Sequence, residues 1–177
     1  MADKTGLIHI YCGDGKGKTT AAIGLAVRAA GAGLKVVLVQ FLKGQQSSEL
    51  LSLALLPNIT LLREKLSPKF SFQMNDTEKA ETIAVHGNYL KTAAELCKEK
   101  NCDVLVLDEV LGALDCGLLD TELLRRFIDQ KPDELELVLT GRNPPQWLCE
   151  KADYISEIHK VKHPFDAGIQ ARIGIEK

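Results

Sequence analysis

The chain has 177 residues, of which 45% are hydrophobic and 26% charged, a composition typical of a globular domain large enough to bury a core. Its net charge of -2 gives no electrostatic case for nucleic acid or an anionic membrane as the main partner, and its apolar runs fall short of the roughly 18 residues that span a bilayer. The N-terminus leads directly into a predicted strand and the five cysteines form no C-x-x-C pair, so we expect a single cytoplasmic domain, residues 1–177, with reduced thiols and no signal peptide.

Apolar runs and helical patterns alternate from one end of the chain to the other. The predicted strands are 7–11, 35–41, 59–62, 103–107, 135–140 and 154–158, and the predicted helices are 18–31, 48–55, 76–100, 118–130 and 144–150. The short apolar runs suit strands that are buried on both faces. Strand–helix alternation predicts parallel strands joined by right-handed crossovers, and hence a three-layer α/β domain. Ligands of such sheets bind beyond the carboxyl ends of the strands, and the aperiodic segment 63–75 is a candidate functional loop at one end of the sheet.

A glycine-rich turn follows the first predicted strand and opens the first predicted helix. It reads Gly13-Asp14-Gly15-Lys16-Gly17-Lys18-Thr19-Thr20, which is the layout of a phosphate-binding loop. Glycine backbones leave successive N–H groups room to turn toward phosphate oxygens, and the helix start adds positive partial charge. We expect Lys18 to contact the phosphates, Lys16 to act as a second cation and Thr19 to bind Mg²⁺. The alternative interpretation is a plain strand–helix turn with surface lysines.

The spacing of this loop is one residue shorter than the usual G-x-x-x-x-G-K-[ST], which would require glycine where Cys12 stands. The predicted ligand is a nucleoside triphosphate, and the altered spacing leaves open the direction in which its phosphates lie. A conventional kinase or ATPase that acts at the γ-phosphate would use the same loop. A non-catalytic, nucleotide-gated binding module would use it as well.

Two carboxylates end the apolar run 104–107, namely Asp108 and Glu109. In phosphate-loop proteins such a carboxylate holds Mg²⁺ opposite the loop. The two side chains point to opposite sides if the strand continues, so we expect only one of them to reach the ion directly. The alternative is a helix start at which both acids complement the helix dipole.

Several segments together resemble the ATP:corrinoid adenosyltransferases, and the resemblance spans nearly the whole chain. The similar segments are 13–22, 28–33, 40–44, 107–109, 140–142 and 161–168, with Ala171, Gly174 and Ile175. The resemblance implies a three-layer α/β domain of the phosphate-loop, RecA-like type with a mostly parallel sheet. It implies that ATP is bound by Gly13, Asp14, Gly15, Lys16, Gly17, Lys18, Thr19, Thr20 and Arg28. For Arg28 the alternative is a surface salt bridge. It also implies that Mg²⁺ is held by Thr19, Asp108 and Glu109.

The resemblance implies alkyl transfer instead of phosphoryl transfer. In the family, Co(I) of a reduced corrinoid, either cob(I)alamin or cob(I)yrinic acid a,c-diamide, attacks the 5′ carbon of ATP and releases triphosphate. ATP lies reversed along the loop, so the triphosphate is the leaving group. Lys16, Lys18 and Mg²⁺ would then neutralise the charge that develops on it. The corrinoid supplies the nucleophile, so no side-chain base is needed.

An aromatic pair, Phe70 and Phe72, lies where family members carry a wedge that displaces the lower ligand of cobalt. The second position is often Trp in the family, and an apolar wedge survives the change to Phe72. The implied roles of both residues are therefore catalytic. The alternative is a pair of core or loop-anchoring aromatics, because the i, i+2 spacing also suits a short strand with one face buried.

About five residues precede the first predicted strand, where many family members carry a helical extension that covers the site. Either the site is more open in this chain or another segment closes it, and the candidate segment is the tail 161–177, with Lys162, His163 and Asp166 near the nucleotide or corrinoid. The alternative is a C-terminal strand and turn with solvated charges. The family suggests a homodimer, and a flavodoxin-like reductase is the expected source of electrons for the corrinoid.

Overall fold

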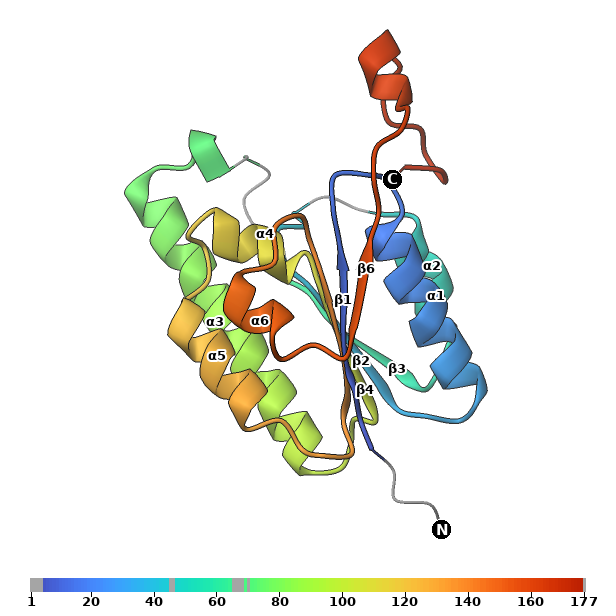
Figure 1. The fold of residues 1–177 in the computed structure, drawn as a ribbon, viewed down its shortest axis with the longest axis vertical. Helices are drawn as coiled ribbons and strands as arrows, with labels where there is room; N and C mark the ends of the chain where they lie inside the picture. The colour runs from blue at the N-terminus through green and yellow to red at the C-terminus, as the bar shows by residue number, and fades with distance from the viewer. Residues whose placement is uncertain (1–4, 45–46, 65–68, 70, 177) are drawn as a thin grey trace.

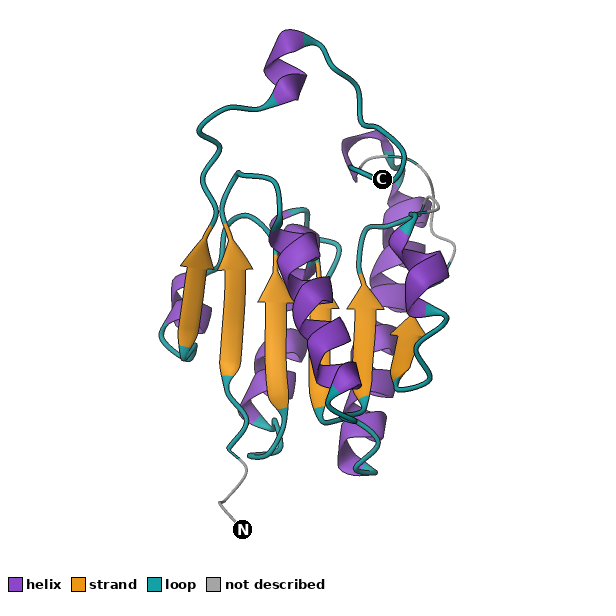
Figure 2. Cartoon of the chain, turned by 90° about the vertical axis from the view of Figure 1, so that its right-hand side faces the viewer, coloured by secondary structure: helices purple, strands orange, loops and turns teal. Residues whose placement is uncertain are grey.

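Six parallel strands in the order β3-β2-β4-β5-β1-β6 form the centre of the computed structural model (Figures 1 and 2). The structure describes residues 5–44, 47–64, 69 and 71–176. The strands are β1 (Ile8–Cys12), β2 (Val36–Gln40), β3 (Ile59–Leu62), β4 (Val104–Asp108), β5 (Glu136–Thr140) and β6 (Tyr154–Glu157). The helices are α1 (Lys18–Gly31), α2 (Glu49–Leu53), α3 (Asp76–Lys98), α4 (Val110–Asp115), α5 (Thr121–Asp129) and α6 (Gln146–Cys149). Two short 3-10 helices, η1 (Ser71–Gln73) and η2 (Pro164–Ala167), complete the described elements.

Helices cover both faces of the sheet, which confirms the predicted three-layer α/β architecture. Figure 1 shows α1 and α2 on one side of the strands and α3, α4, α5 and α6 on the other. Along β4, Val104 and Val106 face the α1 side, where Ala22 and Ala26 allow close packing. Leu105 lies in the core on the opposite side. The whole of β4 is buried, as expected for a parallel strand between two helical layers.

Each predicted strand is present within one residue of its expected bounds. The predicted helices are present too, although the fourth begins at Thr121 because Asp120 caps it by accepting bonds from two backbone N–H groups. The prediction missed α4, which follows β4 directly. Glu109 stands between them in the left-handed region, with φ at 60°. The second interpretation of the acidic pair, a helix start, is therefore correct as a description of the backbone.

The chain after β6 leaves the sheet, and Figure 1 shows it rising beyond the carboxyl ends of the strands and returning toward the start of α1. Residues of its last turn contact the space above the phosphate-loop segment. Within the described part of the chain, no helix is long and apolar enough to cross a membrane.

Candidate functional site

The glycine-rich segment between β1 and α1 is held from outside by two carbonyl groups. The N–H of Gly13 donates to the carbonyl of Arg142 at 3.1 Å, and the N–H of Gly15 donates to that of Ile158 at 2.7 Å. A Cβ on Gly15 would lie 2.7 Å from the same Ile158 oxygen, so glycine is needed for close approach. We expected the loop N–H groups to face phosphates, and this was wrong for Gly13 and Gly15, whose N–H groups bond the segments after β5 and β6. Gly17, with φ at 124°, leads into α1.

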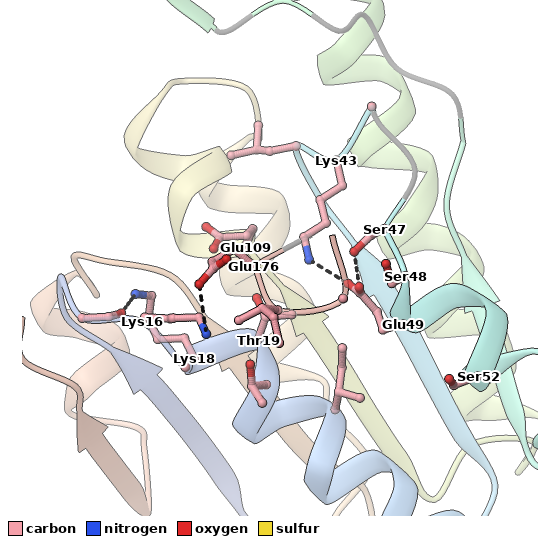
Figure 3. Close-up of a pocket in the computed structure, with 18 of the residues that line it drawn as sticks. Lys16, Lys18, Thr19, Lys43, Ser47, Ser48, Glu49, Ser52, Glu109 and Glu176 are labelled. Atoms are coloured by element: carbon pink, nitrogen blue, oxygen red, sulfur yellow. Dashed lines mark hydrogen bonds and ion pairs between the residues drawn. The ribbon is translucent and has the colours of Figure 1, made fainter. Parts of the chain in front are cut away.

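A cavity of about 820 Å³ opens at the carboxyl ends of the strands, over the start of α1 (Figure 3). This volume lies within the range of small-molecule and cofactor sites. Lys16, Lys18 and Thr19 line it from the phosphate loop. Figure 3 shows Lys43 and Glu49, from the segment after β2, on the opposite side. The position matches the expectation that a ligand lies beyond the carboxyl ends of the strands.

The two loop lysines have different surroundings. Lys18 is buried, and its Nζ donates to the carbonyl of Gly15 at 2.7 Å. Lys16 is half exposed, and its Nζ lies 3.9 Å from a carboxylate oxygen of Glu176 in the C-terminal tail. Thr20 also lines the cavity. The cavity floor therefore carries two cations whose present partners are a peptide carbonyl and one carboxylate.

Asp108 is the centre of the buried polar network below this cavity. Its Oδ1 accepts hydrogen bonds from the hydroxyls of Thr19 and Thr140, both at 2.8 Å. Its Oδ2 lies 3.1 Å from Nζ of Lys43 and accepts a longer bond from Nε2 of Gln40 at 3.4 Å. The side chain has no exposed surface. A fully buried carboxylate is tolerated here because both of its oxygens are hydrogen-bonded or ion-paired.

The pair of Thr19 and Asp108 is where the sequence predicted Mg²⁺, and oxygen donors of this kind suit that ion. Among the described residues, no group of three or more His, Cys, Asp and Glu side chains is arranged to hold a metal. The protein therefore offers a hydroxyl and carboxylates, and phosphate oxygens of a bound nucleotide would have to complete the coordination.

Glu109 lines the cavity, whereas Asp108 is fully buried and does not. Its N–H donates to Oγ1 of Thr140 at 2.8 Å, which fixes the left-handed turn between β4 and α4. Burial, followed by the negative charge of Asp108, raises the pKa of the Glu109 carboxyl, while nearby cations such as Lys18 oppose the rise. A Cβ at Gly112 would lie 3.1 Å from the Glu109 carboxylate, so the glycine leaves room for this side chain.

Lys43 and Glu49 are site residues for which the sequence analysis assigned no role. Nζ of Lys43 lies 3.4 Å from Glu49 as well as 3.1 Å from Asp108. Burial acts to raise the pKa of Glu49, but the hydroxyl of Ser47 and the charge of Lys43 outweigh it and hold the pKa below its usual range. Lys43 belongs to segment 40–44 of the resemblance, which was the available signal. No such signal was available for Glu49, because no local motif indicates which side chains it contacts in the folded chain.

Three of the predicted nucleotide-binding residues, Gly13, Asp14 and Arg28, are not among the residues that line the cavity. Oδ1 of Asp14 accepts the backbone N–H of Lys160 at 2.9 Å, and this bond lowers the pKa of the exposed Asp14 carboxyl. Arg28 lies exposed in the last turn of α1. It comes ten residues after Lys18, which places it about 15 Å along the helix axis. In this arrangement Asp14 ties the loop to the tail, and Arg28 is at the far end of the helix.

The predicted aromatic pair is only partly described. Phe70 lies outside the described residues, whereas Phe72 belongs to η1 and is 81% exposed. The alternative of a core aromatic or of a strand with one face buried is therefore wrong for Phe72. Lys69, three residues before it, lines the cavity. The segment that carries Phe72 thus begins at the edge of the cavity.

The tail reaches the cavity, but through other residues than expected. Lys162 is exposed, Nδ1 of His163 accepts the backbone N–H of Phe165, and Asp166 pairs with Lys160 at 3.1 Å. The tail residues that line the cavity are Gly174, Ile175 and Glu176.

Comparison with known proteins places this chain in a family. The family model described as ATP:corrinoid adenosyltransferase BtuR/CobO/CobP matches residues 4–176. A corrinoid adenosyltransferase of Escherichia coli K12 is 33% identical over 174 residues, which are 98% of this chain and 87% of that protein. One of Pseudomonas aeruginosa is 34% identical over 175 residues, which are 98% of this chain and 85% of that protein.

A solved structure supports the fold class. A KaiC-like protein of Pyrococcus horikoshii OT3 matches with a TM-score of 0.57 at 16% identity, over 97% of this chain and 76% of that one. At this identity the likeness shows the fold alone, and it confirms the expected phosphate-loop, RecA-like class. The match of the family model to nearly every residue, together with two relatives above 30% identity, is decisive: the chain belongs to the ATP:corrinoid adenosyltransferase family.

Proposed function

We propose that this protein transfers the 5′-deoxyadenosyl group of ATP to the Co(I) of a reduced corrinoid and releases triphosphate. The observation that carries the proposal is the shortened phosphate loop beside a cavity of nucleotide size, in a chain that matches this family over residues 4–176. The corrinoid is the nucleophile, a cobalt–carbon bond forms, and the 5′ carbon–oxygen bond breaks with its electron pair leaving on triphosphate. The protein therefore has to orient ATP and stabilise the departing anion.

Lys18 and Lys16 are the residues we propose for that stabilisation. Lys18 is buried, so its charge acts in surroundings that screen it less than water does. Its ammonium now bonds the Gly15 carbonyl and would have to turn only as far as the adjoining cavity to meet a phosphate oxygen. Lys16 reaches the same cavity from the exposed side of the loop. We keep Asp14 and Arg28 as proposed nucleotide contacts only if the tail or the end of α1 rearranges on binding.

Thr19 and Asp108, with Glu109 beside them, are the residues we propose for Mg²⁺. The ion would neutralise negative charge on the triphosphate as it departs. The support is chemical, since the Thr19 hydroxyl lines the cavity and lies 2.8 Å from the Asp108 carboxylate. Lys43 at present balances the Asp108 charge. An ion bound to Asp108 would weaken that pairing and leave Lys43 available to Glu49, which already lies 3.4 Å away.

On the corrinoid side, we propose that Phe72, together with Phe70, forms the apolar contact that displaces the lower ligand of cobalt. The support is that Phe72 is 81% exposed and lies three residues after Lys69, which lines the cavity, so its ring is open to a molecule bound near that segment. We further propose that the protein works as a single-domain homodimer in the cytoplasm with a flavodoxin-like reductase as electron donor. Analytical ultracentrifugation tests the homodimer, and cross-linking to a reduced flavodoxin tests the electron donor.

The experiment that tests the activity uses ATP and chemically reduced cob(I)alamin with the purified chain. The expected result is loss of the Co(I) absorbance in step with triphosphate release and formation of an alkyl–cobalt product. Hydrolysis of ATP to ADP and phosphate without that product would instead support the γ-phosphate chemistry of a conventional kinase or ATPase. Nucleotide binding without any turnover would indicate a binding module.

A further inference from the structure

The last turn of the tail places a carboxylate in the cavity that the phosphate loop lines. Gly174, Ile175 and Glu176 lie in the cavity wall, and Figure 3 shows Glu176 over the phosphate loop near Lys16 and Lys18. Its Oε1 lies 3.9 Å from Nζ of Lys16. An anionic group thus already lies where the loop is built to receive an anion.

Arg172 donates hydrogen bonds to both oxygens of this carboxylate. Its NH2 donates to Oε1 of Glu176 at 2.8 Å, and its Nε and backbone N–H donate to Oε2 at 3.1 and 2.9 Å. These bonds lower the pKa of Glu176 to about 2, with Lys16 adding to the effect. Glu176 is therefore ionised at every pH at which the protein would work, and one carboxylate neutralises two cations.

The same pair of cations suits a phosphate group better than a carboxylate. A guanidinium binds both anions with the same two-pronged geometry, but a phosphate chain carries more charge and more acceptor oxygens. The contact between Glu176 and Lys16 is long, and Arg172 is 58% exposed, so solvent screens both interactions. A polyphosphate that enters the cavity would meet Lys16, which lines it, and would reach Arg172 by taking the place of the Glu176 carboxylate that contacts both.

We propose that Arg172 is a triphosphate-binding residue of the nucleotide site, and that Glu176 occupies its place on Arg172 and Lys16 until nucleotide displaces it. The proposal rests on the proposed function only in requiring that a triphosphate bind at the phosphate loop. It assigns opposite effects to two residues that bond each other. Removing Glu176 removes a competitor, whereas removing Arg172 removes a ligand.

The test is calorimetric titration of the full-length protein with inorganic triphosphate in the presence of Mg²⁺. Glu176→Gln is expected to bind about threefold to fivefold more tightly, the size of effect of one screened ion pair. Arg172→Ala is expected to bind about tenfold less tightly, and Arg172→Lys to fall between it and the unchanged protein because it keeps charge but not the fork. Matched controls are Glu95→Gln on α3 and Arg126→Ala on α5, which are exposed and lie on helices on the opposite face of the sheet from α1.

Weaker binding by Glu176→Gln would overturn the proposal, because the carboxylate would then be a ligand or a support of the site instead of a competitor. Equal binding by Arg172→Ala and the unchanged protein would overturn it as well. Thermal unfolding of each variant separates loss of binding from loss of fold. Triphosphate binding requires no corrinoid, so a chain that shows these shifts but forms no alkyl–cobalt product would refute the proposed function and leave this inference standing.

Discussion

Replacing Asp108 with Asn tests whether the buried carboxylate is the metal-holding group of the site. The side chains have the same shape, and Asn can still accept the two hydroxyl bonds from Thr19 and Thr140. Its amide group, however, would face Nζ of Lys43, which is now 3.1 Å from Oδ2, and two donors would meet. Losing one charge-assisted bond costs about 1.5–3 kcal/mol. Because Lys43 keeps 24% of its side chain exposed and has Glu49 at 3.4 Å, we expect the lower part of that range.

The assay has two parts. Urea unfolding in EDTA measures the stability loss, expected at about 1.5–2 kcal/mol. Calorimetric titration with ATP, with and without Mg²⁺, measures the gain in affinity that the ion gives, which we expect to fall roughly tenfold or more. Asp115→Asn, an exposed carboxylate at the end of α4, is the matched control and should change neither value. An Asp108→Asn protein that keeps the full Mg²⁺-dependent gain would refute the assignment, and a stability loss above about 4 kcal/mol would refute the idea that Lys43 turns to Glu49.

Three further outcomes are expected. Phe72→Ala should slow reaction of a Co(II) corrinoid with reductant far more than reaction of preformed cob(I)alamin, and equal losses in the two assays would remove the wedge role. Glu109→Gln should stabilise the metal-free protein at pH 7. Because folding raises the pKa of Glu109 above its ordinary value of 4.5, the folded protein is destabilised at any pH at which this carboxyl is ionised in the unfolded chain. The gain in free energy of unfolding should vanish below about pH 4, where the carboxyl is protonated in both states, and urea unfolding across pH measures it. Gly15→Ala should destabilise the fold by about 1–3 kcal/mol, since its Cβ would meet the Ile158 carbonyl at 2.7 Å, whereas Gly24→Ala in α1, with open space, should stabilise by about 0.5–1 kcal/mol. Equal effects of the two glycine changes in thermal unfolding would contradict the close-approach argument.

The strands and the longest helices were predictable because their signal is local. The run 104–107 is apolar at every position, and such a run is typical of a strand that is buried on both faces of a parallel sheet. The loop at 13–17 and the carboxylate at 108 were predictable for the same reason, since each has a fixed place at a strand end. Helix α4 was missed because six residues give less than two turns of periodicity, and Gly112 weakens even that.

The rest of the site depends on contacts between distant segments. Glu49 comes only six residues after Lys43 and nine after Gln40, but no local motif indicates that these side chains meet. Nothing near Glu176 indicates Lys16, which is 160 residues earlier. The role of Gly15 was misjudged in the same way, because the atom that forbids a side chain there belongs to Ile158. Local sequence patterns therefore located the site, whereas the residues that surround it could be identified only from the folded structure.

The bond from Gly15 to the Ile158 carbonyl also has a consequence for synthesis on the ribosome. The carbonyl that fixes the phosphate loop follows β6 and is made 143 residues after Gly15. At usual elongation rates that delay is on the order of ten seconds. A nascent chain that already contains β1 and α1 therefore has the residues of the loop without the bond that fixes Gly15, and it gains that bond only after Ile158 has been made.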